Sequence, residues 1–108
     1  MAFRIKPGAK PSFRLEMIKL RKAVEKVFTR HGMTTWLTSG TDGEHSVGSF
    51  HSSGYAEDYD GDRAVSDSEW QEIEDEARKE LDDSRYQLIA HAGHLHGEYD
   101  PPEFKRYK

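Results

Sequence analysis

The chain has 108 residues, which is enough for one domain with a single modest core. Hydrophobic residues make up 34% and charged residues 33%, but five Tyr, five Phe and two Trp supply bulky core side chains, so we expect a folded and very soluble domain. The absence of cysteine excludes disulfides and thiolate metal ligands, and the lack of a long apolar stretch or a signal-peptide h-region predicts cytoplasmic synthesis without a membrane span.

Charge is unevenly distributed along the chain. The net charge is -4, but residues 1–31 carry nine Lys and Arg against two Glu, whereas residues 32–108 carry seven against eighteen Asp and Glu. A basic segment can bind nucleic acid or another anionic polymer, although on a helix it is more often a solvated face. The basic residues, with the interleaved Phe3 and Phe13, are Arg4, Lys6, Lys10, Arg14, Lys19, Arg21 and Lys22. Nucleic-acid binding is an alternative that the acidic remainder disfavours.

Two helices are predicted from apolar residues that recur at three- and four-residue spacing. The first lies within residues 11–30, and His31 and Gly32 end it because Gly suits the left-handed position beyond a helix. The second begins at a capping box that starts at Ser66 or Ser68. The predicted buried stripes are Met17, Leu20, Val24, Val27 and Phe28 in the first helix and Trp70, Ile73, Ala77 and Leu81 in the second.

Four strands are predicted from β-branched, aromatic or alternating residues. They are residues 34–39, 55–60, 85–91 and 94–100. Ala92 and Gly93 join the last two as a hairpin turn in which Gly supplies the positive φ. The segment 40–54 holds four Gly and four Ser, and such a long loop is usually functional or disordered. The element order predicts a single α+β domain in which helices pack on a small antiparallel sheet.

The last hairpin gathers polar residues that can bind a metal. Side chains alternate along a strand, so His94, His96 and Glu98 share one face. The two-residue turn pairs His91 with His94, which brings a third imidazole to the same place. A lone strand histidine is usually structural, but three clustered imidazoles indicate a metal site or a catalytic site.

A second cluster, within the stretch SFHSSGYAED, supplies further ligands. His51 and Asp58 are separated by six residues, with Gly54 between them to turn the chain. One imidazole and one carboxylate from this stretch and one imidazole from the hairpin make three ligands, which leaves a fourth position for water as in catalytic zinc sites. Zinc acidifies that water and polarises the carbonyl that the water attacks.

The two clusters together resemble the D-alanyl-D-alanine metallopeptidase superfamily. That group includes D-Ala-D-Ala carboxypeptidases, phage endopeptidases that cut peptidoglycan stem peptides, and the hedgehog signalling domain. Its signature is H-x6-D followed by H-x-H, with S-x-H and G-x-A-x-D around the first part. The matching residues are Ser49 and His51, then Gly54, Ala56 and Asp58, then His94 and His96. The resemblance covers roughly residues 34–101, and the ending HLHGEYDP is similar to small phage-type members.

The resemblance implies a zinc cofactor and a set of site residues. The implied zinc ligands are His51, Asp58 and His96, and His94 and His91 are implied as assisting residues. Glu98 joins the assisting residues because it lies on the ligand face two residues beyond His96, and Ser39 and Ser49 are the predicted substrate contacts. One departure is Gly93, which stands where active members usually carry an acidic general base. A second is that no Arg between Gly32 and Phe50 matches the family's substrate-polarising Arg.

The predicted function is that of a monomeric zinc-dependent peptidase that hydrolyses peptidoglycan stem peptides at the bacterial cell wall. His91, His94 or Glu98 then takes the role of the missing base. Because a positioned base contributes about 10²–10⁴ in rate, the alternative is a catalytically impaired zinc-binding module of the same fold. A nucleic-acid or virion-assembly binding protein is a further alternative, in which the basic helix is the contact surface.

A calcium loop is a competing interpretation of the acidic stretch after Asp58. The positions of a calcium loop are matched by Asp58, Asp60, Asp62, Ser66 and Glu69. However, Arg63 stands where the sharp turn of such a loop needs Gly. We therefore assign Asp58 to zinc, because His51 accompanies it.

Overall fold

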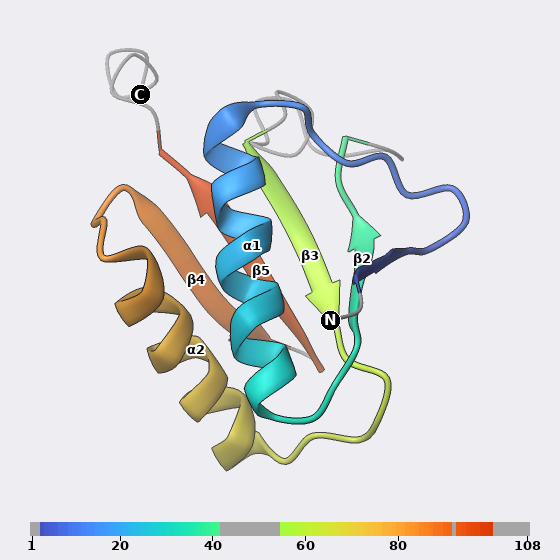
Figure 1. The fold of residues 1–108 in the computed structure, drawn as a ribbon, viewed down its shortest axis with the longest axis vertical. Helices are drawn as coiled ribbons and strands as arrows, with labels where there is room; N and C mark the ends of the chain where they lie inside the picture. The colour runs from blue at the N-terminus through green and yellow to red at the C-terminus, as the bar shows by residue number, and fades with distance from the viewer. Residues whose placement is uncertain (1–2, 42–54, 92, 101–108) are drawn as a thin grey trace.

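A five-stranded sheet with two helices on one face makes up the described part of the chain (Figure 1). The computed structural model describes residues 3–41, 55–91 and 93–100. The elements are β1 Phe3–Ile5, α1 Leu15–Arg30, β2 Thr35–Ser39, β3 Ala56–Asp60, α2 Asp67–Leu81, β4 Tyr86–His91 and β5 His94–Tyr99. The strand order is β1-β2-β3-β5-β4, with α1 lying over the middle of the sheet and α2 beside it, over β4.

The α+β class is confirmed, but the sheet is mixed and not wholly antiparallel. The strands β2, β3, β5 and β4 pair antiparallel as predicted, and β1 adds to β2 in parallel. The segment from β1 to β2 is therefore a βαβ unit, in which α1 joins two parallel strands. The sequence did not predict β1, because three residues are too few for an alternating pattern to appear.

The helix α1 begins at Leu15, later than the predicted residue 11. Arg14 has extended backbone angles, with φ of -68° and ψ of 139°. The backbone N–H of Ser12 donates to the buried carboxylate of Glu57 at 2.8 Å, and the Ser12 hydroxyl accepts from the N–H of Arg14. A contact with β3 therefore keeps residues 12–14 extended, against the helical tendency of the sequence.

Both predicted apolar stripes are buried in one core. The core residues of the two helices include Met17, Leu20, Val24, Val27, Phe28, Trp70, Ile73, Ala77 and Leu81. Of the two predicted caps, Ser66 is the one used, since its hydroxyl accepts from the N–H of Glu69 at 3.2 Å. At Gly97 in β5, a Cβ would lie 2.9 Å from the Leu20 side chain, so this glycine lets α1 approach the sheet. Within the described ranges, neither helix has the length and apolar character needed to cross a membrane.

The C-terminal half of α1 is basic and faces an acidic α2. Lys26 and Arg30 both contact Glu80, at 2.6 Å and 2.7 Å. Arg30 also lies 3.7 Å from Glu76. Exposed pairs of this kind contribute little each. These pairs nevertheless give the uneven charge distribution a structural role. Part of the basic segment and part of the acidic remainder contact each other at the interface between α1 and α2.

His31, just after α1, lies between two carboxylates of α2. Its Nδ1 is 2.9 Å from Glu69 and its Nε2 is 3.0 Å from Glu76. Partial burial alone would lower the pKa of His31, but the hydrogen bonds to the two carboxylates outweigh it and raise the pKa above 6.5. Arg63, and after it His31, lower the pKa of Glu69 to about 2.

The charge on His31 makes stability depend on pH. Because its folded pKa is raised, protonation of His31 stabilises the fold fully below about pH 6.5, and this contribution is lost as the pH rises through the folded pKa. We expect the excess unfolding free energy of the wild type over His31→Gln to be largest near about pH 6 and smallest near about pH 9, measured by urea denaturation. Lys79→Gln, an exposed change on α2, is the control. An equal excess at both pH values would contradict the prediction.

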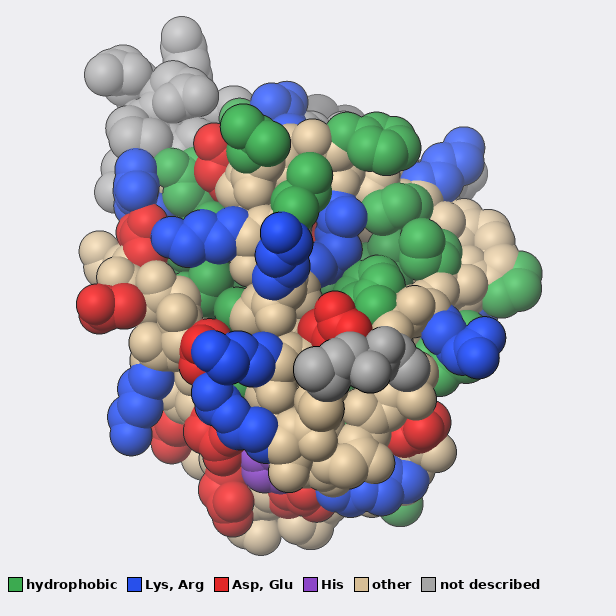
Figure 2. All heavy atoms as spheres, viewed as in Figure 1, with side chains coloured by type: hydrophobic (Ala, Val, Ile, Leu, Met, Phe, Trp, Pro, Cys, Tyr) green, Lys and Arg blue, Asp and Glu red, His purple; other side chains and the backbone are tan. Residues whose placement is uncertain are grey.

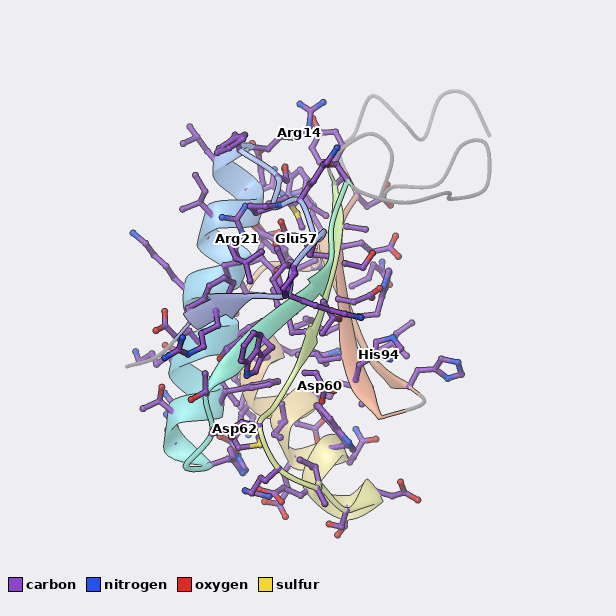
Figure 3. All side chains as sticks on the ribbon, turned by 90° about the vertical axis from the view of Figure 1, so that its right-hand side faces the viewer. Arg14, Arg21, Glu57, Asp60, Asp62 and His94 are labelled. Carbon is purple, nitrogen blue, oxygen red and sulfur yellow. The ribbon has the colours of Figure 1, made fainter. Side chains whose placement is uncertain are left out.

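The buried carboxylate of Glu57 joins three parts of the molecule. Besides Ser12, it accepts hydrogen bonds from Arg21 Nε at 2.9 Å and from the Tyr59 hydroxyl at 2.7 Å. Arg21 also donates to the Ser12 carbonyl. Burial, and then the Glu57 charge, raise the pKa of Tyr59 well above its usual value, so the hydroxyl stays protonated and donates. Figure 3 places Arg21 and Glu57 together between α1 and the sheet.

Removing the Glu57 carboxylate should destabilise the fold strongly. We expect Glu57→Ala to lower the free energy of unfolding by about 3–5 kcal/mol, because it leaves Arg21 facing a buried site without its anion and removes the acceptor of Ser12 and Tyr59. The exposed control Glu72→Ala should change it by less than about 0.5 kcal/mol. Urea denaturation measures both, and equal effects of the two variants would contradict the role assigned to Glu57.

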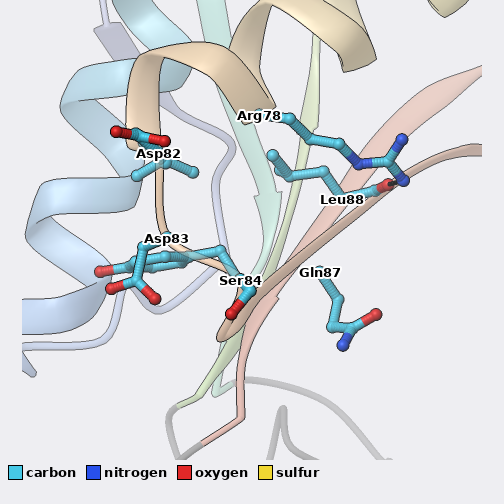
Figure 4. A pocket seen from close by; sticks show the side chains of 8 residues that line it. Arg78, Asp82, Asp83, Ser84, Gln87 and Leu88 are labelled. Atoms are coloured by element: carbon cyan, nitrogen blue, oxygen red, sulfur yellow. Dashed lines mark hydrogen bonds between the residues drawn. The ribbon is translucent and has the colours of Figure 1, made fainter.

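The outer edge of β4 is covered by side chains of α2. Glu74 accepts the N–H of Ala90 at 2.8 Å, and Arg78 donates to the carbonyl of Leu88 at 2.7 Å. The second contact is drawn in Figure 4, beside a cavity of about 320 Å³ between the end of α2 and β4. These backbone groups belong to an edge strand and would otherwise be open to pairing with another chain.

Candidate metal centre

The face of the sheet opposite the helices carries the predicted site, and we call it the open face. Alternation along β5 buries Leu95, Gly97 and Tyr99 against the helices and leaves His94, His96 and Glu98 half-buried on the open face. In Figure 3, His94 and Asp60 lie on the side of the sheet away from α1. The predicted sharing of one face by the two histidines and Glu98 is therefore confirmed.

Asp58 and His96 meet at the centre of this face. The pairing of β3 with β5 places them directly opposite each other. His96 Nδ1 lies 2.7 Å from Asp58 Oδ1, and His96 Nε2 lies 2.9 Å from Glu98 Oε1. These two hydrogen bonds, that to Asp58 first, raise the pKa of His96 to about 9. At neutral pH and without a metal, both ring nitrogens of His96 therefore carry a proton.

The other two hairpin histidines lie toward the turn. His94 Nε2 is 3.7 Å from Asp58 Oδ1, so one carboxylate oxygen faces two imidazoles. His91 and His94 are register partners as predicted, and their ring centroids are 6.2 Å apart. Gly93 has a φ of 83°, which confirms the predicted positive φ in the turn. His91 is exposed at the edge strand, and its imidazole extends the cluster away from Asp58.

Of the remaining predicted site residues, the structure describes Ser39 but not His51 or Ser49. Ser39 in β2 is the register partner of Asp58, so it lies beside the candidate site. A register irregularity between Leu37 and Ser39 occurs at this point of β2. The predicted ligand His51 and the predicted substrate contact Ser49 lie outside the described residues.

The calcium loop is not realised, and the structure overturns that alternative. Asp58 and Asp60 lie in the extended strand β3, so they cannot belong to a compact loop. Ser66 caps α2, and the carboxylate of Glu69 is held by Arg63 at 2.7 Å and by His31. The acidic and hydroxyl residues match the ligand spacing of a calcium loop by coincidence. They belong to a strand, a connection and a capping box that follow one another in the chain.

Several residues of the open face were missed by sequence reasoning. β4 contributes Gln87 and Ile89, the partners of Glu98 and His96. β1 contributes Arg4 and β2 contributes Trp36, and the guanidinium of Arg4 lies 6.0 Å from the centre of the Trp36 ring. Alternation alone could have assigned each of these residues to a face of its own strand. Their presence on the same face of one sheet as Asp58 could be known only from the strand order, which the sequence pattern does not contain.

The donor set fits a zinc ion as far as it is described. A carboxylate and an imidazole are ligand types that zinc prefers, and Asp58 and His96 converge on the same space. Among residues 3–41, 55–91 and 93–100, no three His, Asp or Glu side chains form a ready metal site. A zinc ion bound here would need a third ligand from elsewhere in the chain, and it would have to displace a proton from His96.

No protein-family model, no curated protein and no solved structure matches this chain. The resemblance to the metallopeptidase superfamily thus stays a prediction.

Proposed function

We propose that the protein is a zinc-dependent peptidase that hydrolyses peptidoglycan stem peptides of the bacterial cell wall. The observation that carries the proposal is the 2.7 Å contact between Asp58 and His96 on the open face. These are two of the three residues that the motifs H-x6-D and H-x-H select as ligands, and they come from strands far apart in the sequence. We propose His51 as the third ligand.

The protein's own residues would divide the work around the metal. Asp58 and His96 hold it, while Glu98 accepts from the other ring nitrogen of His96 and so fixes the orientation of the ring. His94, beside Asp58, is placed to contact substrate. When bound, zinc supplies a Lewis acid that polarises a peptide carbonyl and acidifies water. Neither described helix packs on the open face, so an extended peptide could approach these groups past the described residues.

The proposed active site has no acidic side chain at residue 93, where the family's active members usually carry the general base. Gly93 has no side chain, and Glu98 is already engaged by His96. These two facts favour a second candidate, in which the domain binds zinc but turns over substrate slowly. The two candidates share the same ligands and differ only in rate.

Zinc binding tests both candidates together. We expect the purified protein to bind about one zinc per chain, and His96→Ala or His51→Ala to abolish binding because each removes one of only three protein ligands. His91→Ala is the matched histidine control and should retain the metal. Isothermal titration with zinc after removal of bound metal measures this. A wild-type protein that binds no zinc would overturn the proposed function.

The substitution of Gly93 tests the missing base. We expect Gly93→Asp to raise the rate of cell-wall clearing by at least about ten-fold, because a positioned base contributes about 10²–10⁴. Gly93→Asn is the matched control, since it has the same shape and tolerates positive φ but cannot accept a proton. A Cβ at Gly93 meets nothing within 4 Å, so the cost is only the strained φ, about 1 kcal/mol. Equal rates for Asp and Asn would place the base elsewhere.

A further inference from the structure

Two large apolar side chains project into solvent where α1 begins. Phe13 is 88% exposed and Leu15 is 79% exposed. They flank Arg14, which is also exposed, so three consecutive exposed residues lie where α1 begins. We call the surface formed by Phe13, Arg14, Leu15, Lys19 and Lys22 the α1 tip.

The lysines of the α1 tip lie on the outward stripe of the helix. Leu15, Lys19 and Lys22 are spaced at i, i+4 and i+7, which aligns them on one face, opposite the buried stripe. All three are exposed, so the helix presents an apolar end followed by cations.

The two lysines of the tip differ from the cations further along α1. Lys26 and Arg30 are paired with α2, whereas Lys19 and Lys22 form no ion pair within the described part of the chain. Lys19 lies 6.0 Å from the ring of Tyr86, and Arg14 stacks on Tyr55 at 4.1 Å. Figure 2 shows the result: Lys and Arg gather with hydrophobic side chains over the upper part of this face, and alternate with Asp and Glu over the lower part.

A binding partner of the α1 tip has to match both its positive charge and its exposed apolar side chains. A polyanion such as nucleic acid would use the lysines and arginine, but it would leave Phe13 and Leu15 in water. An anionic bilayer uses both, because the cations meet the lipid phosphates while apolar side chains enter the boundary between headgroups and acyl chains.

We propose that the α1 tip binds the surface of an anionic lipid bilayer. The proposal is independent of the metal centre and of the proposed peptidase function. In Figure 3, Arg14 lies at one end of the molecule, whereas His94 and Asp60 lie on the far side of the sheet from α1. A protein docked through the tip would therefore not bring His94 and Asp60 against the bilayer.

Sedimentation of the full chain with vesicles tests the proposal. We expect binding to vesicles of phosphatidylglycerol and phosphatidylcholine, and none to vesicles of phosphatidylcholine alone. The double variant Phe13→Ser, Leu15→Ser should weaken binding by more than about ten-fold. Lys19→Ala with Lys22→Ala should weaken it by roughly five-fold per lysine and reduce its salt dependence.

Matched controls lie on other faces of the molecule. Ile89→Ser removes an apolar side chain that is 50% exposed on the open face, and Lys79→Ala removes an exposed cation of α2. Neither should change binding to the vesicles. All the changed tip residues are exposed, so thermal unfolding should be the same for variants and wild type, which separates lost binding from lost folding.

Three results would overturn the proposal. The first is that the wild type does not bind the phosphatidylglycerol vesicles. The second is that the lysine variant loses binding while the Phe13 and Leu15 variant keeps it, because the tip would then be a site for polyanions in general. The third is a dimer in sedimentation equilibrium that Phe13→Ser dissociates, because the tip would then be an interface between two copies of the chain.

Discussion

The carboxylate of Glu57 sits at the point where the sheet, α1 and the extended segment before α1 come together. Its bonds to Ser12, Arg21 and Tyr59 fix where α1 begins and how the helix lies on β3. Removing one partner of a buried, hydrogen-bonded carboxylate costs more free energy than forming the interaction contributes. Ser12, Arg21 and Tyr59 are therefore held with little freedom. The next residue along β3 is Asp58, which points to the opposite side. The constraint on Glu57 therefore also holds Asp58 in place on the open face.

The sheet uses its two faces for different purposes. One face packs on two helices and supplies the hydrophobic core, and the other carries His94, His96, Asp58 and Glu98. This division depends on strict alternation, since a shift of one residue in β5 would bury the histidines and expose Leu95. The positive φ of Gly93 and the lack of room for a Cβ at Gly97, beside Leu20, both oppose such a shift. The geometry of the candidate site is thus set by core packing.

The sequence patterns predicted correctly those elements that are specified by residues close together in the chain. The stripes of α1 and α2, the cap at Ser66 and the pairing of His91 with His94 all follow from spacing within one short segment. The parallel strand β1 and the delayed start of α1 do not, because each depends on a partner far away in the sequence. Glu57 was missed for the same reason. In the run YAEDYD it reads as one acidic residue among several, and only the position of Arg21 and Ser12 makes it a buried anchor. His51, the third predicted ligand, lies outside the described residues.

The cover over β4 has a consequence for how the chain is made. Glu74 and Arg78 belong to α2, which precedes β4 in the sequence, so a ribosome releases the covering helix before the strand whose edge it covers. If α2 is already helical when β4 emerges, the unpaired backbone groups of the strand need not wait for another partner. In a rearranged gene that placed α2 after the hairpin, the same contacts would exist in the finished protein. The newly made strand would, however, be exposed for as long as synthesis of the helix takes.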